Sequence, residues 1–236
     1  MRLYIIRHGD PDYEHDDLTE PGRAEAEALA SLFSAEGLDE IYSSSLGRAR
    51  RTAGYTASAL GLDVFIEPWA REIHELRDPA TGLMVWDYDP GLFAAMSESD
   101  RDAAFFGGAW RSMLPFDRPD LPGVIDRIAN GADDFMARQG YLRESGLYRI
   151  MRRNDKKVAL FCHNGSGLTM LAHFLRMPPP LVWGSFFFHT SSVTTLLFEE
   201  RSPGIATVRC VGLSDLSHLR LAGLPIGTSG FLANLE

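Results

Sequence analysis

The sequence predicts an α/β fold, because short apolar runs typical of strands alternate with segments that carry apolar residues at helical spacing. Two of the runs end at a histidine: Leu3–Ile6 leads to His8, and Val158–Cys162 leads to His163. Between about residues 72 and 157 the pattern changes, and aromatic residues are scattered among Asp, Gly and Pro. Together these observations predict a three-layer α/β/α arrangement with a mostly parallel sheet and an inserted, mainly helical cap.

The N-terminal part contains two successive strand and helix units. The first strand is followed by a polar loop over residues 10–17, and Thr19 is a suitable N-cap for a helix that has Pro21 in its first turn. In the second unit, a strand ends at Tyr42, the serines at 43–45 supply a hydroxyl cap, and a helix runs to about Leu60 before a glycine. A further short strand is expected over residues 63–66.

The C-terminal part continues the alternation. A helix follows His163, and strands are expected at Val193–Phe198 and Ala206–Val211, with a hairpin around 201–204 as one way to join them. The cap is expected at about 77–156 and includes a longer amphipathic helix over 123–138. We therefore expect one domain spanning residues 1–236, with the cap as an insertion.

Composition excludes several classes of protein. The 236 residues carry a net charge of −9, and the one dense basic cluster, at 152–157, is interrupted by Asn154 and Asp155, so no nucleic acid or membrane partner is expected. Residues 1–10 do not resemble a signal peptide and no apolar run is long enough to span a membrane, so a cytoplasmic location is expected. Cys162 and Cys210 provide neither a disulfide framework nor a zinc site.

The candidate chemistry lies where the strands end. In open α/β sheets ligands bind beyond the carboxyl ends of the strands, and two strands deliver His8 and His163 to that edge. Arg7 precedes the first histidine, and Arg48 lies in the first turn of the second expected helix. Guanidinium groups are suited to bidentate contacts with phosphate or carboxylate. The arrangement indicates an anion-binding site at this edge.

The chain resembles the histidine phosphatase superfamily, which includes the cofactor-dependent phosphoglycerate mutases. The resemblance covers most of the chain outside the cap and rests on several motifs in the same order and at similar spacing. They are Arg7-His8-Gly9, Leu18-Thr19 with Gly22 and Ala26, Tyr42-Ser43-Ser44 with Leu46, Arg48-Ala49 and Thr52-Ala53, Arg71-Glu72, and His163 after an apolar strand.

The resemblance implies a mechanism without a metal or other cofactor. His8 would attack phosphorus and form a phosphohistidine intermediate, while Arg7, Arg48 and His163 would contact the phosphoryl oxygens. Glu72 would be the general acid that protonates the leaving oxygen and later helps to deprotonate water. Glu75 is a less favoured choice for the acid. The catalytic residues expected are thus His8, Glu72 and His163, and the phosphate-binding residues are Arg7, Arg48, His163 and Asn164.

Two departures from the family pattern bear on function. Asn164 stands where many relatives have glycine, so either the following loop donates backbone N–H groups to phosphate or the Asn164 amide fills part of the pocket. Asp10, Pro11 and Asp12 follow the first histidine motif, and the added negative charge disfavours highly anionic substrates such as bisphosphoglycerate. Hydrolysis of a phosphomonoester, either a small molecule or a protein, is therefore favoured over mutase-type phosphotransfer.

Other interpretations remain open at this point. A non-catalytic relative would bind phosphorylated ligands through the same cations, and a metal-dependent hydrolase would use the acidic loop at 10–17, for which a solvated loop is the favoured explanation. His74 is interpreted as incidental, His173 as a core residue and His189 as structural. An apolar C-terminal segment at 219–235 is expected to cover a sheet edge. The sequence leaves the substrate and the oligomeric state open.

Overall fold

A mixed sheet forms the centre of the computed structural model, which describes residues 1–78, 81–88, 91–94 and 96–231. Within these residues, eight strands are hydrogen-bonded in the order β5-β4-β8-β1-β9-β10-β7-β6, and a separate small hairpin pairs β2 with β3. The strands are β1 (Arg2–Arg7), β2 (Pro11–Asp12), β3 (Asp17–Leu18), β4 (Glu40–Ser43), β5 (Val64–Ile66), β6 (Tyr141–Glu144), β7 (Leu147–Ile150), β8 (Lys157–Cys162), β9 (Val193–Ser202) and β10 (Ile205–Asp215).

The sheet is parallel on one side of β1 and antiparallel on the other. Strands β5, β4, β8 and β1 pair in parallel, whereas β9, β10, β7 and β6 continue from β1 with antiparallel pairing. The predicted α/β class is confirmed, but the sheet is mixed rather than mostly parallel. Two of the antiparallel pairs have a local reason, because tight turns at Ser145-Gly146 and Pro203-Gly204 join β6 to β7 and β9 to β10 and require each pair to be antiparallel.

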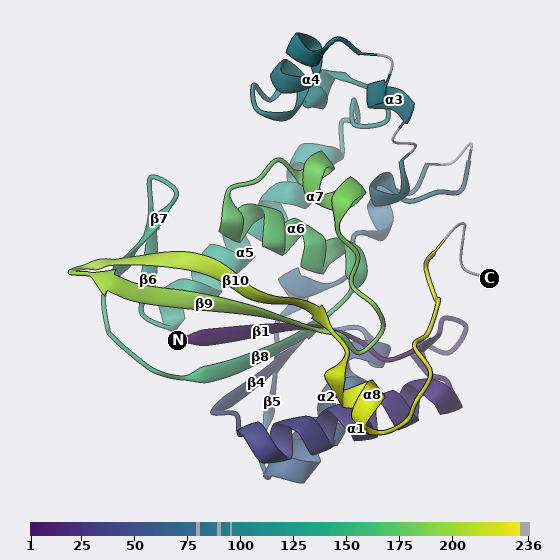
Figure 1. Ribbon diagram of the computed structural model, residues 1–236, viewed down its shortest axis with the longest axis vertical. Coiled ribbons are helices and arrows are strands. Elements are labelled where there is room, and N and C mark those ends of the chain that lie inside the picture. The colour runs from purple at the N-terminus through teal and green to yellow at the C-terminus, as the bar shows by residue number, and fades with distance from the viewer. Residues whose placement is uncertain (79–80, 89–90, 95, 232–236) are drawn as a thin grey trace.

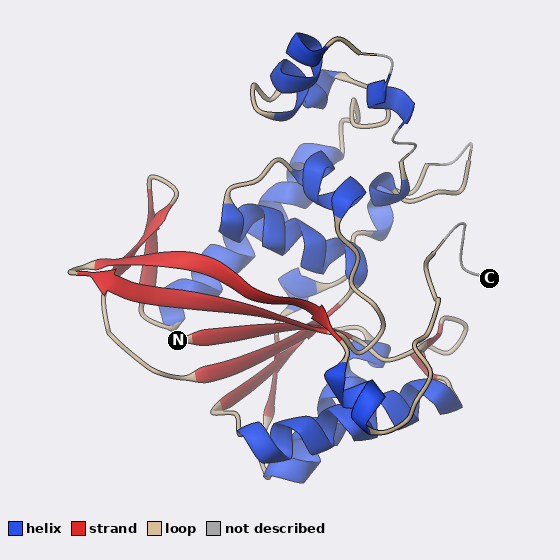
Figure 2. Ribbon diagram, viewed as in Figure 1, coloured by secondary structure: helices blue, strands red, loops and turns tan. Residues whose placement is uncertain are grey.

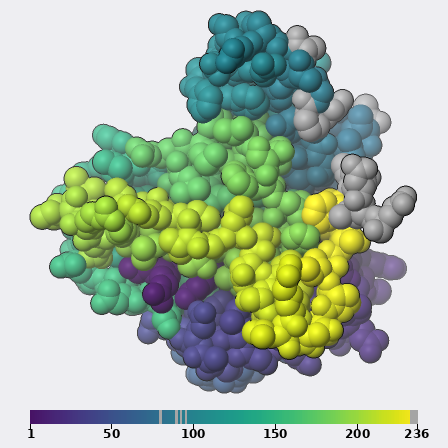
Figure 3. All heavy atoms as spheres, in the orientation of Figure 1, coloured from purple at the N-terminus to yellow at the C-terminus, as the bar shows by residue number. Residues whose placement is uncertain are grey.

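Helices cover both faces of the sheet, as expected for three layers (Figures 1 and 2). One face carries α1 (Glu20–Glu36), α2 (Gly47–Leu60) and α8 (Ser217–Leu221), and the other carries α5 (Leu121–Arg138), α6 (Asn164–Leu175) and α7 (Pro179–Ser185). In Figure 3 the C-terminal residues, in yellow, lie on the surface near α1, against which α8 packs. Among the described helices, none has the length and apolar character needed to cross a membrane.

Alternate side chains of β1 belong to two different clusters of the hydrophobic core. Leu3 and Ile5 pack in the cluster that contains residues of α5 and α6, whereas Tyr4 and Ile6 pack in the cluster beneath α1 and α2. Successive side chains of a strand point to opposite faces, so a continuously apolar strand is buried on both sides. The apolar run at the start of the sequence therefore becomes the middle of the sheet.

The helix ends follow the sequence signals in part. Thr19 is the N-cap of α1 and its hydroxyl accepts the N–H of Gly22 at 3.1 Å, as predicted, and Gly61 ends α2 in the left-handed conformation. The expected hydroxyl cap of α2 is wrong, because its N-cap is Leu46, which forms no side-chain cap. The Ser44 hydroxyl accepts the N–H of Leu46 instead, and it also contacts His163.

The inserted segment is partly helical and lies beyond α7 in Figure 1. Its short core includes Phe93, Trp110 and Phe116, which are buried against one another, whereas Phe106 is exposed. Its helices are α3 (Gly91–Ala94) and α4 (Glu98–Phe105), and the 3-10 helices of this region and its approach are η1 (Pro68–Ala70), η2 (His74–Leu76), η3 (Val85–Asp87) and η4 (Ala109–Ser112).

The range of about 77–156 expected for the cap contains elements of the central sheet as well as the short helices. Strands β6 and β7 fall inside that range but extend the central sheet, and α5 packs against α6 and β6. Neither strand was predicted from the sequence, because the apolar residues of each are few and do not form a continuous run. Residues 79–80, 89–90 and 95 of the expected cap lie outside the described residues. The division into one domain with an insertion stays a prediction.

Candidate active site

The two histidines predicted to act together lie side by side. Strands β1 and β8 are parallel neighbours with Arg7 paired to Cys162, so the residues that follow them emerge at the same edge of the sheet. The ring centroids of His8 and His163 are 5.1 Å apart. They lie beside a cavity of about 400 Å³ lined by Arg7, His8, Tyr13, Arg48, Glu72, His74, Arg77, Met84, Trp86, Asp87, Asn164 and Gly230.

His8 is buried and its tautomer follows from its two neighbours. Its Nδ1 lies 2.7 Å from the carbonyl oxygen of Gly9, which can only accept, and its Nε2 lies 3.3 Å from Arg48 Nε, which can only donate. The hydrogen is therefore on Nδ1 and the lone pair on Nε2. Burial, followed by the charges of Arg7 and Arg48, lowers the pKa of His8 well below its usual value. The ring is a neutral imidazole with its lone pair on Nε2.

Two arginines flank this ring. The buried Arg7 donates from Nη1 to the carbonyl of Phe188 at 2.6 Å and from Nη2 to the carbonyl of Ser229 at 3.3 Å. Arg7 Nε is buried and has no hydrogen-bond partner among the described residues. Arg48, also buried, donates to His8 and forms an ion pair with Asp16 at 2.5 Å. A guanidinium group has five N–H groups, so both arginines keep donors, the Arg7 Nε–H among them, that an anion can use.

His163 is fully buried and is held by a serine. Its Nε2 lies 2.7 Å from the Ser44 hydroxyl, while its Nδ1 has no partner among the described residues. Burial, and then the neighbouring His8 and Arg48, lowers the pKa of His163 well below its usual value. The ring is therefore neutral and presents an unpaired ring nitrogen, which is costly to bury without a ligand.

Glu72 and Asn164 meet at the start of α6. Glu72 Oε1 accepts the N–H groups of Ile73 at 3.0 Å and Ser166 at 2.9 Å, and Oε2 accepts that of Gly165 at 3.2 Å. The helix begins at Asn164, so the residues expected to form a loop after His163 are its first turn. The N–H groups of Gly165 and Ser166, considered as phosphate donors, are used by Glu72. Asn164 lines the cavity, and its Oδ1 accepts the N–H of Phe188.

Most of the other candidate residues considered from the sequence lie outside the cavity. Glu75 forms ion pairs with Arg71 and Arg127. His173 lies 2.8 Å from Asp133, His189 contacts the Gly227 carbonyl and His218 contacts Ser191. Burial raises the pKa of the Cys162 thiol, which makes it a poor nucleophile. His74, interpreted as incidental, lines the cavity.

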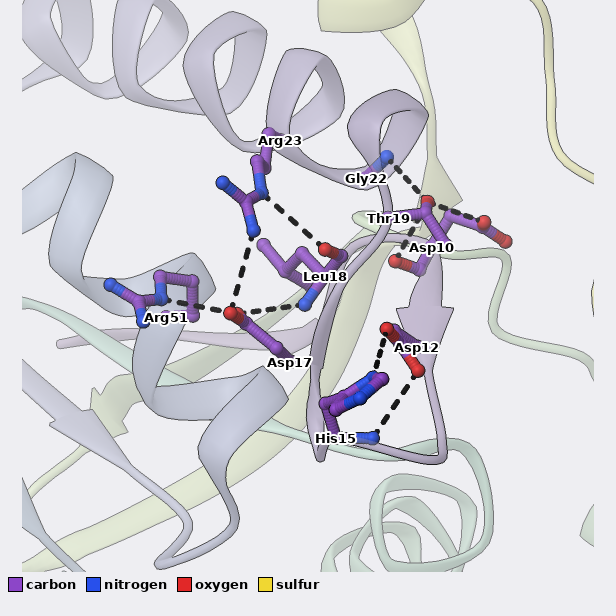
Figure 4. Close-up of polar contacts among 9 residues, drawn as sticks. All are labelled: Asp10, Asp12, His15, Asp17, Leu18, Thr19, Gly22, Arg23 and Arg51. Carbon is purple, nitrogen blue, oxygen red and sulfur yellow. Dashed lines mark hydrogen bonds and ion pairs between the residues drawn. The ribbon is translucent and has the colours of Figure 1, made fainter.

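Three carboxylates of the acidic loop at 10–17 form hydrogen bonds or ion pairs with other groups of the protein (Figure 4). Asp10 accepts the Thr19 hydroxyl at 2.7 Å, Asp12 contacts His15 at 2.8 Å, and Asp17 lies between Arg23 and Arg51. Among the described residues, no group of three or more His, Cys, Asp or Glu side chains is arranged to hold a metal ion. The carboxylates of Asp10, Asp12 and Asp17 are thus hydrogen-bonded or ion-paired within the protein.

Sequence reasoning missed several residues of the cavity and its supports. Asp87 was not singled out at all, whereas Ser44 was noted only as part of a motif and Asp16 only as one acid of the loop at 10–17, because their importance depends on which side chain the fold brings beside them. Ser229 and Gly230, towards the end of the C-terminal segment at 219–235, were also missed as neighbours of Arg7, although the segment was noted as apolar. Residues 232–235 lie outside the described residues. Because Tyr13 and Trp86 line the cavity, they are candidates to contact a leaving group.

A larger cavity of about 630 Å³ lies close by and contains neither histidine. It is mainly apolar and shares only Met84 with the lining of the histidine cavity. A cavity of about 850 Å³ beside α2 and β5 is larger still, but the neutral histidines with Arg7 and Arg48 gather at the smaller cavity. We therefore assign the candidate chemistry to the smaller one.

Comparison with known sequences shows similarity over the N-terminal part. Residues 3–108 match the model of the histidine phosphatase superfamily (branch 1). The chain is 32% identical over 83 residues to the probable phosphoglycerate mutase GpmB of Photorhabdus laumondii and to that of Serratia proteamaculans. Each match covers 31% of this chain and 39% of the relative, so the matched region spans well under half of those proteins.

Comparison with solved structures shows the same fold over nearly the whole chain. A mutant of phosphoserine phosphatase from Entamoeba histolytica in complex with phosphoserine has a TM-score of 0.61 at 20% identity, covering 92% of this chain and 98% of that one. A mycobacterial glucosyl-3-phosphoglycerate phosphatase has a TM-score of 0.60 at 23% identity, covering 89% and 97%. The alpha-ribazole phosphatase of Shigella flexneri has 0.58 at 20% identity, covering 91% and 96%.

Proposed function

This chain belongs to the histidine phosphatase superfamily, and on that premise we propose that it is a metal-independent phosphomonoester hydrolase with His8 as its nucleophile. The observation that carries the proposal is the state of His8: a buried, neutral ring with its lone pair on Nε2, next to two arginines. A neutral imidazole nitrogen is the form that can attack phosphorus. Arg7 Nε and His163 Nδ1 are buried without a hydrogen-bond partner among the described residues, and an anionic ligand beside His8 would offer them one.

In the first step, His8 Nε2 forms a bond to phosphorus while the bond from phosphorus to the leaving oxygen breaks, and the carboxyl group of Glu72 gives that oxygen a proton. Arg7, Arg48 and His163 contact the equatorial oxygens, where negative charge is concentrated in the transition state. Asn164 lies at the edge of the same cavity and is proposed to orient the phosphoryl group. Removing one such donor is expected to cost about 10²-fold to 10³-fold in kcat, by analogy with oxyanion holes.

In the second step, water attacks the phosphohistidine and the bond between phosphorus and Nε2 breaks. Glu72 is suited to accept the proton of this water. Three backbone N–H groups occupy three of the roughly four lone-pair positions of its carboxylate, and the remaining position is on Oε2. The products are an alcohol and inorganic phosphate, and His8 returns to its neutral form.

Hydrolysis is favoured over mutase-type transfer by the charges around the cavity. Asp16 already occupies Nη1 of Arg48, and Glu72 and Asp87 both line the cavity. A substrate with a second phosphate would meet these carboxylates, and Arg77 is the one further arginine of the lining that could offset them. A single phosphate on a less charged leaving group meets no such repulsion.

The test is hydrolysis of an aryl phosphate with EDTA present, from about pH 4 to about pH 9. Wild type is compared with His8→Ala and with His15→Ala, in which an exposed histidine of the acidic loop is replaced. Turnover and an acid-labile phosphoenzyme are expected in wild type and His15→Ala, and neither in His8→Ala. Phosphate binding without turnover would favour a non-catalytic relative, and loss of activity with EDTA would favour metal chemistry.

A further inference from the structure

Helix α5 holds the stretch of chain that leads from β5 to Glu72. Arg127 and Gly131 are four residues apart on this helix, so they lie on the same face, one turn after the other. The ring of Trp69 packs against this face so closely that a Cβ placed on Gly131 would lie 2.3 Å from it. The chain just before Glu72 is therefore docked on a long helix of the central domain.

Arg127 contacts the backbone directly before Glu72. Its Nη1 donates to the carbonyl oxygen of Trp69 at 2.7 Å and to that of Arg71 at 3.2 Å. The Arg71 carbonyl belongs to the planar peptide group that ends at the nitrogen of Glu72, so its direction also fixes that of the Glu72 N–H. On the other side of Glu72, Arg127 Nη2 lies 3.7 Å from Glu75 Oε2 in an ion pair. One guanidinium group thus spans the chain before and after Glu72.

The carboxylate of Glu72 is held from a second helix, α6. Its Oε1 accepts the N–H of Ser166 and its Oε2 that of Gly165, while the N–H of Ile73, the next residue in the chain, also donates to Oε1. The side chain is therefore anchored on α6 and its backbone on α5, and the two helices pack against each other. Because the Ile73 N–H links backbone and carboxylate, a shift of the backbone also moves the free lone pair of Oε2.

Arg127 and Glu72 are also linked electrostatically. Burial, and then the charge of Arg71, lowers the pKa of Arg127, whereas the charges of Glu75 and Glu72 act in the opposite direction. Arginine stays protonated in proteins, so Arg127 keeps its positive charge. The effect of Glu75 is larger than that of Glu72, which makes the backbone contacts the closer link between Arg127 and Glu72.

We propose that Arg127 is a positioning residue for Glu72, and that by holding the carbonyls of Trp69 and Arg71 it directs the Glu72 carboxyl group toward the leaving oxygen. This inference rests on the proposed hydrolase function, in which Glu72 gives a proton in the first step and accepts one in the second. Arg127 does not belong to the described lining of the histidine cavity, so it acts through Glu72 and not on the substrate. A misplacement of about 1 Å in a catalytic group can cost about 10²-fold in rate.

The experiment compares two substrates that differ in their need for an acid. An alkyl phosphate needs a proton on its leaving oxygen, whereas 4-nitrophenyl phosphate releases a stable phenolate. Arg127→Met is expected to lower kcat/KM for the alkyl phosphate by about tenfold to 10²-fold, but for the nitrophenyl ester by less than about threefold. With the nitrophenyl ester, kcat and KM should fall together, because the second step slows and phosphohistidine accumulates. A merely structural role would lower kcat/KM for both substrates equally.

Arg118→Met is the matched control. Arg118 donates to the carbonyls of Glu75 and Arg77, farther along the same stretch of chain, at 2.9 and 3.0 Å. Each arginine also forms an ion pair, Arg118 with Asp120 and Arg127 with Glu75, and their side chains are 21% and 20% exposed. Urea denaturation should therefore show a similar loss of stability in both variants, whereas only Arg127→Met should discriminate between the two substrates.

The double variant Glu72→Gln/Arg127→Met tests whether Arg127 acts through Glu72. Glu72→Gln removes the group that carries the proton, so Arg127→Met should lower kcat/KM for the alkyl phosphate no further in this background. A further loss there, or equal losses on both substrates in Arg127→Met alone, would overturn the role of Arg127 while leaving the hydrolase intact. Wild type that hydrolyses neither substrate would overturn the proposed function itself, and the role of Arg127 with it.

Arg127→Lys keeps the test decisive if the methionine variant does not fold. Lysine retains the charge and a long stem but not the planar fork, so the loss of kcat/KM for the alkyl phosphate should be smaller, at least about threefold, and again absent for the nitrophenyl ester. Wild-type kinetics on both substrates in a folded variant at this position would show that Glu72 does not depend on Arg127.

Discussion

Asp16 and Arg48 form an ion pair that joins the acidic loop to the nucleophile. Asp16 Oδ1 accepts from Arg48 Nη1 at 2.5 Å, and Asp16 Oδ2 accepts the N–H of Gly47 at 2.6 Å at the start of α2. The Nε of the same guanidinium donates to His8. Asp16 has a φ of 49°, in the left-handed region where Asp and Asn are enriched. One carboxylate thus fixes both the helix end and the arginine beside His8.

Replacing Asp16 is expected to impair catalysis more than folding. In Asp16→Asn the amide cannot accept from both Gly47 and Arg48, so one charge-assisted hydrogen bond is lost, which corresponds to about 1.5 to 3 kcal/mol, or roughly a tenfold to hundredfold drop in kcat/KM. Asp17→Asn, which removes only exposed ion pairs, is the control and should change kcat/KM little. Steady-state kinetics with an aryl phosphate measure both. Equal effects of the two substitutions would show that Asp16 does not position Arg48.

Gly165 is expected to tolerate no side chain while Trp86 is present. A Cβ at this position meets the Trp86 ring at 2.2 Å, so Gly165→Ala should cost about 1 to 3 kcal/mol of unfolding free energy by overpacking. The double variant with Trp86→Ala relieves the clash. Urea denaturation of wild type, the two single variants and the double variant gives the coupling energy between the two substitutions. It should be opposite in sign to the loss of unfolding free energy in Gly165→Ala alone. Additive effects would mean that the two residues do not touch in solution.

Protonation of His218 is expected to lower the free energy of unfolding at acid pH. Burial lowers its pKa from 6.5 to about 4, so the unfolded chain binds more protons than the folded one between these values. The free energy of unfolding should therefore fall as the pH is lowered from about 6.5 to about 4, with His218 contributing up to about 3 kcal/mol of the change. Above pH 6.5 its contribution is constant.

The measurement is urea denaturation across this pH range for wild type, His218→Asn and the control His15→Asn. The wild type and the control should lose stability with the same slope, and His218→Asn should lose less. His8 and His163 act in the same direction as His218, but they are present in all three proteins and cancel in the comparison. Parallel curves for all three proteins would contradict the prediction.

The sequence predicted the histidine pair because its position depends on regular structure. Two apolar strands that each end at a histidine bring these residues to one sheet edge if the strands are parallel neighbours, and β1 and β8 are. The position of Arg7 could be predicted because it belongs to the first of these strands. That of Arg48 could be predicted because it lies in the first turn of a helix whose end is marked by Gly61. The catalytic roles of these residues stay predictions.

Asp87 was not predictable in the same way. It belongs to a segment without a helical or strand period, and its position depends on aromatic packing such as that of Tyr88 against Phe93 and Phe116. Asp16 was noted only as one acid of a solvated loop, since nothing in the local sequence shows that Arg48 lies beside it. The mixed sheet was missed for a related reason, because β6 and β7 carry too few apolar residues to stand out.

The strand order has a consequence for the protein during its synthesis. Strand β8 lies between β4 and β1, yet it is made long after both, and the contact of Ser44 with His163 joins residues 119 positions apart. Until β8 leaves the ribosome, the facing edges of β1 and β4 have no partner, and unpaired apolar strand edges favour aggregation. Nascent chains that stop before β8 should therefore depend on chaperones, and so many distant contacts predict slow refolding of the full chain.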